Sequence, residues 1–158
     1  MNILVSVIIP VYNVERWIRE SLDSVCEQAL QDIEIICVND GSPDRSLEIL
    51  KEYATRDDRI VIIDKENEGV GAARNDGIRA ARGEYVAFMD PDDKYPDPDT
   101  LKLLYDAAKE HDVLVAGGYF GCINEKSERI EKSRSYYGVD FSCSGLTQYK
   151  DFQCDYQF

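Results

Sequence analysis

Three carboxylates follow a short apolar run, and their spacing is suited to holding a divalent cation. Residues 85–89 are apolar, with aromatic and β-branched types among them, and the flanking Gly83 and Pro91 favour a short buried strand over a helix. Asp90 and Asp92 come next, two positions apart in extended chain, which places both carboxylates on one side of the backbone. Hard oxygen ligands of this kind suit Mg²⁺ or Mn²⁺, and a cation held by only two of them keeps positions open for water and substrate phosphate.

The alternative for this acidic stretch is a solvated turn that leads into the next helix. Asp97 and Asp99 continue the polar run, as such a turn would. Both interpretations remain open on the motif alone. The position still favours a site, because ligands of parallel α/β sheets bind in the crevice at the carboxyl ends of the strands, where Asp90, Asp92 and Asp93 stand.

Two more polar residues follow predicted strands. Asp40 comes after the apolar run 33–38, and Gly41 lets the backbone turn sharply beside it. Arg74 is the one cation in a run of small residues that follows a third predicted strand at 60–63. Both residues are therefore candidates for the same edge of the sheet as the three acids.

The small residues before Arg74 have an alternative interpretation, which their surroundings exclude. Gly69 and Gly71 suggest a dinucleotide-binding fingerprint. However, Arg74 occupies the third glycine position, and the motif follows the third strand whereas the fingerprint follows the first. Small side chains at 69–73 instead let a helix pack close to a sheet or to a ligand.

Apolar strands alternate with amphipathic helices along most of the chain. Strands are predicted at residues 3–9, 33–38, 60–63, 85–89 and 113–116. Helices are predicted from Val14 with Asn13 as N-cap, from Pro43 with Ser42 as N-cap, through the small residues after Gly69, and from Asp99. This order predicts an α/β fold with a doubly wound, mostly parallel, Rossmann-like sheet, helices on both faces and right-handed crossovers. After Gly117 the pattern is irregular and suggests a hairpin.

Composition narrows the classes of protein to consider. A chain of 158 residues with 44% hydrophobic content is long enough for one well-cored domain, and its net charge of −13 argues against nonspecific binding to nucleic acid, which needs a basic surface. The five cysteines include no C-x-x-C pair, so neither a zinc knuckle nor a disulfide framework is indicated. No apolar run approaches the roughly 20 residues of a membrane span, and the start lacks the basic region of a signal peptide, so we expect a cytoplasmic protein.

Four sequence blocks together resemble a known family. In chain order they are residues 6–13 (SVIIPVYN), 38–42 (VNDGS), the pattern Asn67-x-Gly69-x-x-x-Ala73-Arg74-Asn75, and Asp90-x-Asp92-Asp93. They resemble the nucleotide-binding half of the inverting family 2 glycosyltransferases, which have the glycosyltransferase A fold. The resemblance covers about residues 3–116.

The resemblance implies a role for each matching residue. Those implied for the nucleotide are Pro10, Val11 and Tyr12 lining the nucleoside pocket, Asp40 accepting a hydrogen bond from the base, commonly uracil, and Arg74 near the base and diphosphate. Asp90 would approach the ribose and the metal, and Asp92 would bind the Mn²⁺ or Mg²⁺ that bridges the two phosphates. Asn39 stands where the family more often has an acid, which would alter the hydrogen bonds around the nucleoside.

The resemblance also implies a reaction. A sugar would pass from a nucleoside diphosphate sugar, UDP-linked, to a glycan or lipid-linked acceptor in polysaccharide biosynthesis, with inversion and with a divalent cation stabilising the leaving diphosphate. A base must deprotonate the acceptor hydroxyl, and no acidic motif between residues 117 and 158 matches the family's base. We therefore expect residues 1–116 to form a donor-binding subdomain, and 117–158 to begin an incomplete acceptor-side region of a longer enzyme. Further chain would attach that enzyme peripherally to the inner face of the membrane.

Three other functions are known for sheets or substrates of this kind. A noncatalytic module that binds nucleotide sugars remains open, because the catalytic base is not recognised. A sugar-nucleotide pyrophosphorylase would carry a glycine-rich phosphate loop directly after the first strand, where residues 10–13 read PVYN. A phosphoacceptor receiver domain would carry an acid pair at the same place, and none is there.

Overall fold

A computed structural model describes residues 2–114, 116–117, 122–123 and 129–130, which fall into two compact units. The first unit, Met1–Gly117, holds four strands and four helices in alternation. In the second unit, Gly118–Phe158, two short strands pair antiparallel, β5 (Cys122–Ile123) and β6 (Arg129–Ile130). No helix within these described ranges is long and apolar enough to cross a bilayer.

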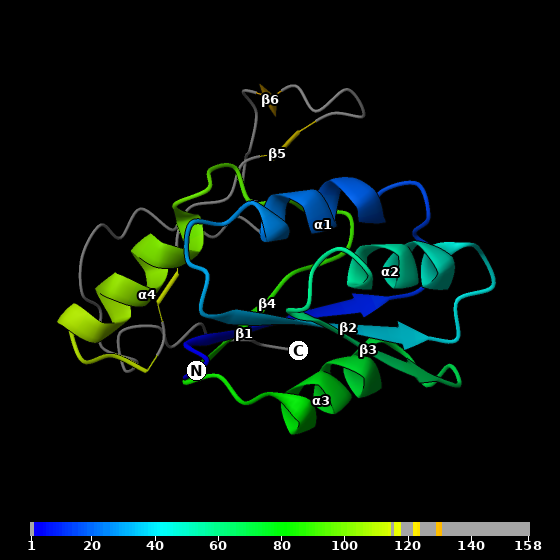
Figure 1. Cartoon of the computed structure of the whole chain (residues 1–158), viewed down its shortest axis with the longest axis horizontal. Coiled ribbons are helices and arrows are strands. Elements are labelled where there is room, and N and C mark those ends of the chain that lie inside the picture. The colour runs from blue at the N-terminus through cyan, green and yellow to red at the C-terminus, as the bar shows by residue number, and fades with distance from the viewer. Residues whose placement is uncertain (1, 115, 118–121, 124–128, 131–158) are drawn as a thin grey trace, which may run out of the picture. The chain divides into compact units, whose positions relative to one another are not determined.

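The first unit is built on a four-stranded sheet in the order β3-β2-β1-β4 (Figure 1). Its strands are β1 (Val5–Val11), β2 (Ile33–Asp40), β3 (Ile60–Lys65) and β4 (Tyr85–Phe88). All three pairings are parallel, and β1 lies between β2 and β4. The predicted α/β fold with a mostly parallel sheet is therefore confirmed.

Helices cover both faces of this sheet. They are α1 (Ile18–Cys26), α2 (Ser46–Ala54), α3 (Val70–Ala80) and α4 (Thr100–Glu110). Figure 1 shows α1 and α2 on one face and α3 on the other. Gly77 lets α3 approach closely, because a Cβ atom there would lie 2.4 Å from Cγ2 of Ile8. Close packing of small residues, as predicted for this helix, thus has a definite contact partner.

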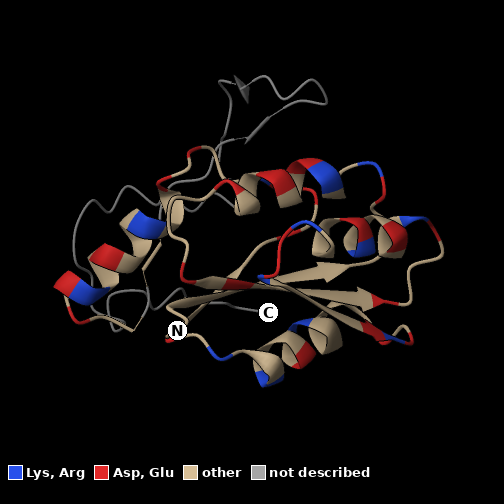
Figure 2. Cartoon of the chain, in the orientation of Figure 1, with Lys and Arg blue, Asp and Glu red and all other residues tan. Residues whose placement is uncertain are grey.

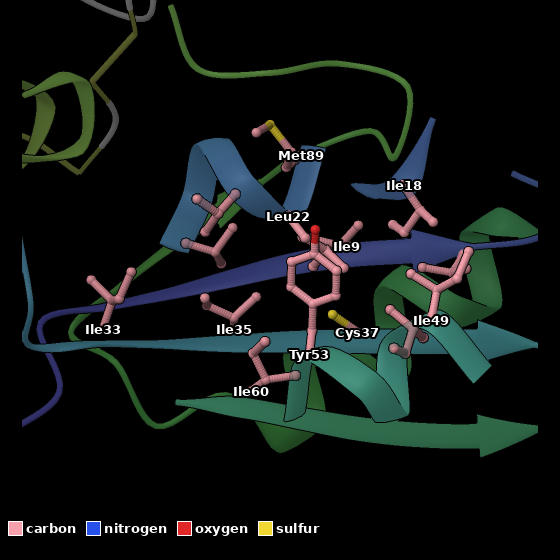
Figure 3. Packing of buried hydrophobic residues seen from close by; sticks show 14 of the residues in the cluster. Ile9, Ile18, Leu22, Ile33, Ile35, Cys37, Ile49, Tyr53, Ile60 and Met89 are labelled. Atoms are coloured by element: carbon pink, nitrogen blue, oxygen red, sulfur yellow. The ribbon is translucent and has the colours of Figure 1, made fainter. Parts of the chain in front are cut away.

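The core has two parts because alternate strand residues point to opposite faces. Ile9, Ile35 and Cys37 face Leu22 and Tyr53 of α1 and α2 (Figure 3). On the other face, a smaller cluster joins Ile8, Ile36 and Val38 to Ala73 of α3. Burial on both faces explains why β1 and β2 read as continuous apolar runs rather than as alternating ones.

Three strands extend beyond their predicted ends, which changes the place of the site residues. Val11 and Asp40 are the last residues of β1 and β2, not loop residues. Pro10 has no amide hydrogen, and its place inside β1 does not require one. Ile8, two residues earlier, bonds toward the β4 side, because its carbonyl accepts from the amide of Met89. Pro10 faces that same side, and β4 has ended before the level of Pro10, so no strand there needs a hydrogen bond from it.

Two helix starts were predicted too early. Helix α1 begins at Ile18 instead of Val14, and α2 begins at Ser46 instead of Pro43. Asn13 does not cap a helix but adopts a left-handed φ of 55° in a turn, and the hydroxyl of Ser42 bonds to that turn rather than to its own helix. Tertiary contacts between loops therefore replaced the local capping that the sequence suggested.

The strand predicted at 113–116 is wrong for the residues described. Val113, Leu114 and Ala116 lie in irregular chain, and residue 115 is outside the described part. The carbonyl of Val113 accepts a hydrogen bond from the hydroxyl of Tyr85 at 3.2 Å, while Leu114 is 94% exposed. An apolar run forms a strand only where a neighbouring strand pairs with its backbone. Here the carbonyl of Val113 bonds to the side chain of Tyr85 and not to a strand.

Candidate functional site

The predicted site residues gather at the carboxyl edge of the sheet. Parallel pairing aligns Val11 of β1 with Asn39 of β2, and Asp40 of β2 with Lys65 of β3. On the other side of β1, the chain leaves β4 and reaches Asp90 two residues later. Charged residues lie mainly in the helices, at strand ends and in loops (Figure 2).

The three residues predicted to line a nucleoside pocket present different groups. Val11 is fully buried and its side chain belongs to the core beneath the edge. Tyr12 follows the strand and is 49% exposed, so its ring is available at the edge. Pro10 lies in β1 opposite Val38. Of the three, Tyr12 offers the largest accessible surface to a ligand.

Asp40 is buried and holds the loop that leads into α3. One carboxylate oxygen accepts from the amide of Glu68 at 2.9 Å and from Nζ of Lys65 at 3.2 Å, and the other accepts from the amide of Gly69 at 2.7 Å. Burial alone would raise the pKa of Asp40, but these hydrogen bonds outweigh it and the pKa is lowered. Asp40 is therefore a carboxylate that fixes Gly69, whose φ of 92° suits glycine.

Asn39 contributes an acceptor that sequence reasoning did not use. Its Nδ2 donates to Oδ1 of Asp64 at 2.7 Å, which fixes the orientation of the amide. The Oδ1 atom of Asn39 is buried and has no hydrogen-bond partner within the described ranges. An acid at this position would repel Asp64, so the asparagine and Asp64 form a compatible pair at the ends of β2 and β3.

Arg74 and Asp90 form an ion pair across the edge. Nη2 of Arg74 lies 2.6 Å from Oδ1 of Asp90, and both side chains are partly exposed. The Nε atom of Arg74 is buried and unpartnered in the part of the chain that the structure describes. The pairing links α3 to the end of β4, and no local pattern could have shown it because 16 residues separate the two.

The three acids after β4 lie close enough to repel one another. The amide of Asp93 donates to the carbonyl of Asp90 at 3.0 Å, which closes a turn. Burial, followed by the charges of Asp92 and Asp90, raises the pKa of Asp93. A divalent cation would relieve this repulsion.

These acids could supply only some of the ligands that a divalent cation needs. Among the residues described, no three or more His, Cys, Asp or Glu side chains are arranged to hold a metal ion. Asp90 and Asp92 are both exposed, so their oxygens can reach a cation whose other ligands are water and phosphate. Asp90 and Asp92 stay predicted ligands, and Arg74 lies beside Asp90 as a competing cation.

A separate groove lies between α1 and the chain after Asp93. Its volume is about 280 Å³, and none of the predicted site residues lines it. Gln28 holds the two walls together, since its side chain donates to the carbonyl of Asp97 at 3.0 Å and accepts from the amide of Leu101 at 2.9 Å. The groove is therefore a consequence of how the 94–98 segment is fastened to α1.

The chain is similar in sequence to known proteins. The family model described as "Glycosyl transferase family 2" matches residues 6–156. A Bacillus subtilis (strain 168) protein named "Uncharacterized glycosyltransferase EpsJ" is 48% identical over 126 residues, which cover 80% of this chain and 36% of that protein.

Two solved structures share the fold. The crystal structure of S. aureus TarS residues 1–349 in complex with UDP-GlcNAc superposes with a TM-score of 0.64 at 34% identity, covering 69% of this chain and 32% of that one. The mannosyltransferase PcManGT from Pyrobaculum calidifontis, in complex with GDP-Man and Mn²⁺, gives a TM-score of 0.60 at 30% identity over 64% of this chain and 31% of that one. This chain therefore spans about a third of the length of these relatives.

Proposed function

The chain belongs to glycosyl transferase family 2, and we propose that it forms the donor-binding part of an enzyme that uses a UDP-linked sugar. The enzyme would transfer the sugar, with inversion, to a glycan or lipid-linked acceptor in polysaccharide biosynthesis. The observation that carries the proposal is the meeting of Tyr12, Asp40, Arg74 and Asp90 at one edge of the sheet, where ligands of such sheets bind. TarS supports the donor class, because its structure holds UDP-GlcNAc.

At the nucleoside end, Tyr12 would stack on the base and Asp40 would accept a hydrogen bond from it. Each oxygen of a carboxylate can accept two hydrogen bonds. Within the described part of the chain, the oxygen of Asp40 that binds Gly69 accepts one bond, whereas the other oxygen accepts two. One acceptor position thus remains on Asp40 for the imide N–H of uracil, and because Asp40 is 2% exposed, the base would reach it when the loop at residues 67–69 moves on binding.

At the diphosphate end, Asp90 and Asp92 would hold Mn²⁺ or Mg²⁺, as the Mn²⁺ in the PcManGT complex suggests. When bound, the cation stabilises negative charge on the leaving diphosphate as a Lewis acid. Arg74 carries a second positive charge toward the same place and is held there by Asp90. Its guanidinium would orient the diphosphate through charge-assisted hydrogen bonds.

The acceptor side lies outside these residues. The division proposed from the sequence stands as part of this hypothesis, with residues 1–116 binding the donor and 117–158 beginning the acceptor side. Three acids of that later stretch, Asp140, Asp151 and Asp155, are candidates to test as a base, and all three lie outside the described residues. We place the whole enzyme in the cytoplasm at the inner face of the membrane, where a lipid-linked acceptor would be reached.

Isothermal titration calorimetry with UDP, with and without Mn²⁺, tests the donor site. We expect Mn²⁺ to tighten UDP binding, and Asp92→Asn to abolish that metal-dependent gain by removing a charged ligand. Asp99→Asn, which changes an exposed acid later in the same acidic stretch, is the matched control and should retain the gain. Equal affinity with and without metal in the unaltered protein would contradict the metal site. Donor binding without turnover, in a longer protein of the length of the relatives, would favour a noncatalytic module.

A further inference from the structure

The turn after β1 is held by side chains from the loop after β2. Three consecutive amides of the turn each donate to a different side chain, two in that loop and one at Ser46, the first residue of α2. These pairs are Asn13 to Oγ of Ser42 at 3.3 Å, Val14 to Oγ of Ser46 at 3.2 Å, and Glu15 to Oδ2 of Asp44 at 2.8 Å. In return, the carboxylate of Glu15 accepts from the amide of Arg45 at 2.9 Å. We call these contacts the loop clasp.

Asp44 is the one charged side chain from the β2 side of the clasp, and it serves both loops. Its second oxygen accepts from the amide of Ser46 at 3.0 Å, at the start of α2. Burial alone would raise the pKa of Asp44, but hydrogen bonds from Ser46 and Glu15 outweigh burial and lower it. Asp44 is therefore a carboxylate at neutral pH, and it bonds to one amide of the turn that carries Tyr12 and to one amide at the start of α2.

The amides in this turn occupy a place where many α/β proteins bind phosphate. Free amides after the first strand of such a sheet bind phosphate groups in nucleotide-binding proteins. Here Asn13, Val14 and Glu15 each have an acceptor already, so these three amides have no free hydrogen for a phosphate. The left-handed φ of 55° at Asn13 is held in the same way, since its amide and the carbonyl of Val11 both bond to Ser42.

We infer that Asp44 is a positioning residue for the nucleoside, acting through the turn that presents Tyr12. It fixes the turn before the ligand arrives and keeps phosphate away from the turn's amides. The base is then directed to Tyr12, and the diphosphate extends toward Arg74 and Asp90 at the other end of the edge. This inference rests on the proposed function, because it assumes that the nucleoside lies beside Tyr12.

The test measures affinity for uridine and for Mn²⁺-pyrophosphate separately, in the unaltered protein and in Asp44→Ala. We expect the variant to bind uridine about tenfold more weakly, because a turn that is no longer preorganised must be ordered on binding. Affinity for Mn²⁺-pyrophosphate should stay within about twofold, since the inference places that group at Arg74 and Asp90. Asp44→Asn keeps one acceptor oxygen and should recover part of the uridine affinity.

Two controls separate positioning from a general loss of stability. Asp57→Ala removes a carboxylate that accepts from the amide of Arg59 at 3.0 Å in the loop before β3, and it should lower Tm without changing uridine affinity. Added formate should restore uridine binding in Asp44→Ala by filling the position of the carboxylate. The amide resonances of Glu15 and Ser46 should shift with formate in that variant and not in the unaltered protein.

The outcomes are distinguishable. If the unaltered protein binds UDP, and Asp44→Ala binds uridine as tightly as the unaltered protein does, the inference is wrong and the proposed function stands. If Asp57→Ala and Asp44→Ala lose uridine affinity equally at equal loss of Tm, the role of Asp44 is only structural and the inference is also wrong. If the unaltered protein binds neither UDP nor uridine, the proposed function fails and the inference fails with it.

Discussion

Replacing Asp40 with alanine should destabilise the protein even in the absence of ligand. The carboxylate accepts two backbone amides, those of Glu68 and Gly69, and pairs with Lys65. Asp40 is 2% exposed, so water cannot take its place without a rearrangement of the loop. The expected consequence is a looser start of α3, on which Arg74 depends for its position.

The magnitude follows from those contacts. A hydrogen bond to a charged group contributes about 1.5–3 kcal/mol, and the loop can partly relax toward solvent because Glu68 is exposed. We therefore expect the free energy of unfolding to fall by about 2–4 kcal/mol at pH 7, or roughly 10 °C in Tm. Since the pKa of Asp40 is lowered in the folded state, its contribution is present above its unfolded pKa of about 3.9 and is lost as pH falls through the lower folded value.

Urea unfolding followed by circular dichroism and by the fluorescence of Trp17 measures this loss. Lys65→Met is the matched control, because it removes the ion pairs of Lys65 with Asp40, Glu68 and Asp76 and leaves both amide bonds to Asp40 intact. The control should cost less than Asp40→Ala, because the two backbone amides still bond to the carboxylate of Asp40. A value for Asp40→Ala within about 0.5 kcal/mol of the unaltered protein would refute the anchoring role, since this is the usual range for surface changes that break no such contact.

Two further predictions concern the sheet. Glu34 is buried, and its carboxylate accepts from Oγ of Ser6 and from the amide of Arg82, each at 2.6 Å. Burial alone would raise the pKa of Glu34, but these hydrogen bonds and the guanidinium of Arg82 outweigh burial and lower it. Glu34→Gln should therefore lower the free energy of unfolding by about 1–3 kcal/mol at pH 7, and the difference should shrink as pH falls below about 4, so equal urea midpoints at pH 7 would contradict it. Gly77→Ala should destabilise by about 1–2 kcal/mol, because overpacking against Ile8 exceeds the gain in helix propensity, and a rise in Tm would show that α3 can move away from the sheet.

The architecture could be predicted from the sequence because its signals are local and repeated. Apolar runs ending in polar residues located four strands, and their alternation with helices gave the parallel sheet. The signals failed where loops exchange partners. Asn13 and Ser42 are residue types that often cap helices, but here each bonds to the loop that contains the other. Helices α1 and α2 therefore start later than predicted.

The candidate site divides in the same way. Placement at strand ends brought Asp40 and Asp90 to one edge, as predicted from topology. The contacts of Asp40 with Gly69 and of Arg74 with Asp90 join segments from different strands and helices, and nothing in the spacing of single motifs encodes them. The apolar run at 113–116 failed for a related reason, because strand formation depends on a partner that local composition does not reveal.

The two ends of the edge differ in how firmly they are held, which has a kinetic consequence. Asp44 and Asp40 fasten the loops after β1 and β3 through several backbone amides, whereas a single partly exposed ion pair holds Arg74 to Asp90. A nucleoside base that stacks on Tyr12 meets a turn that is already ordered, and the proposed metal ligands lie at the other end, so its association rate should hardly depend on metal. At the other end, a cation adds contacts to the carboxylates and the diphosphate, and these contacts must break before the donor leaves, so the cation acts on dissociation. A divalent cation should therefore lengthen the residence time of the donor far more than it speeds capture.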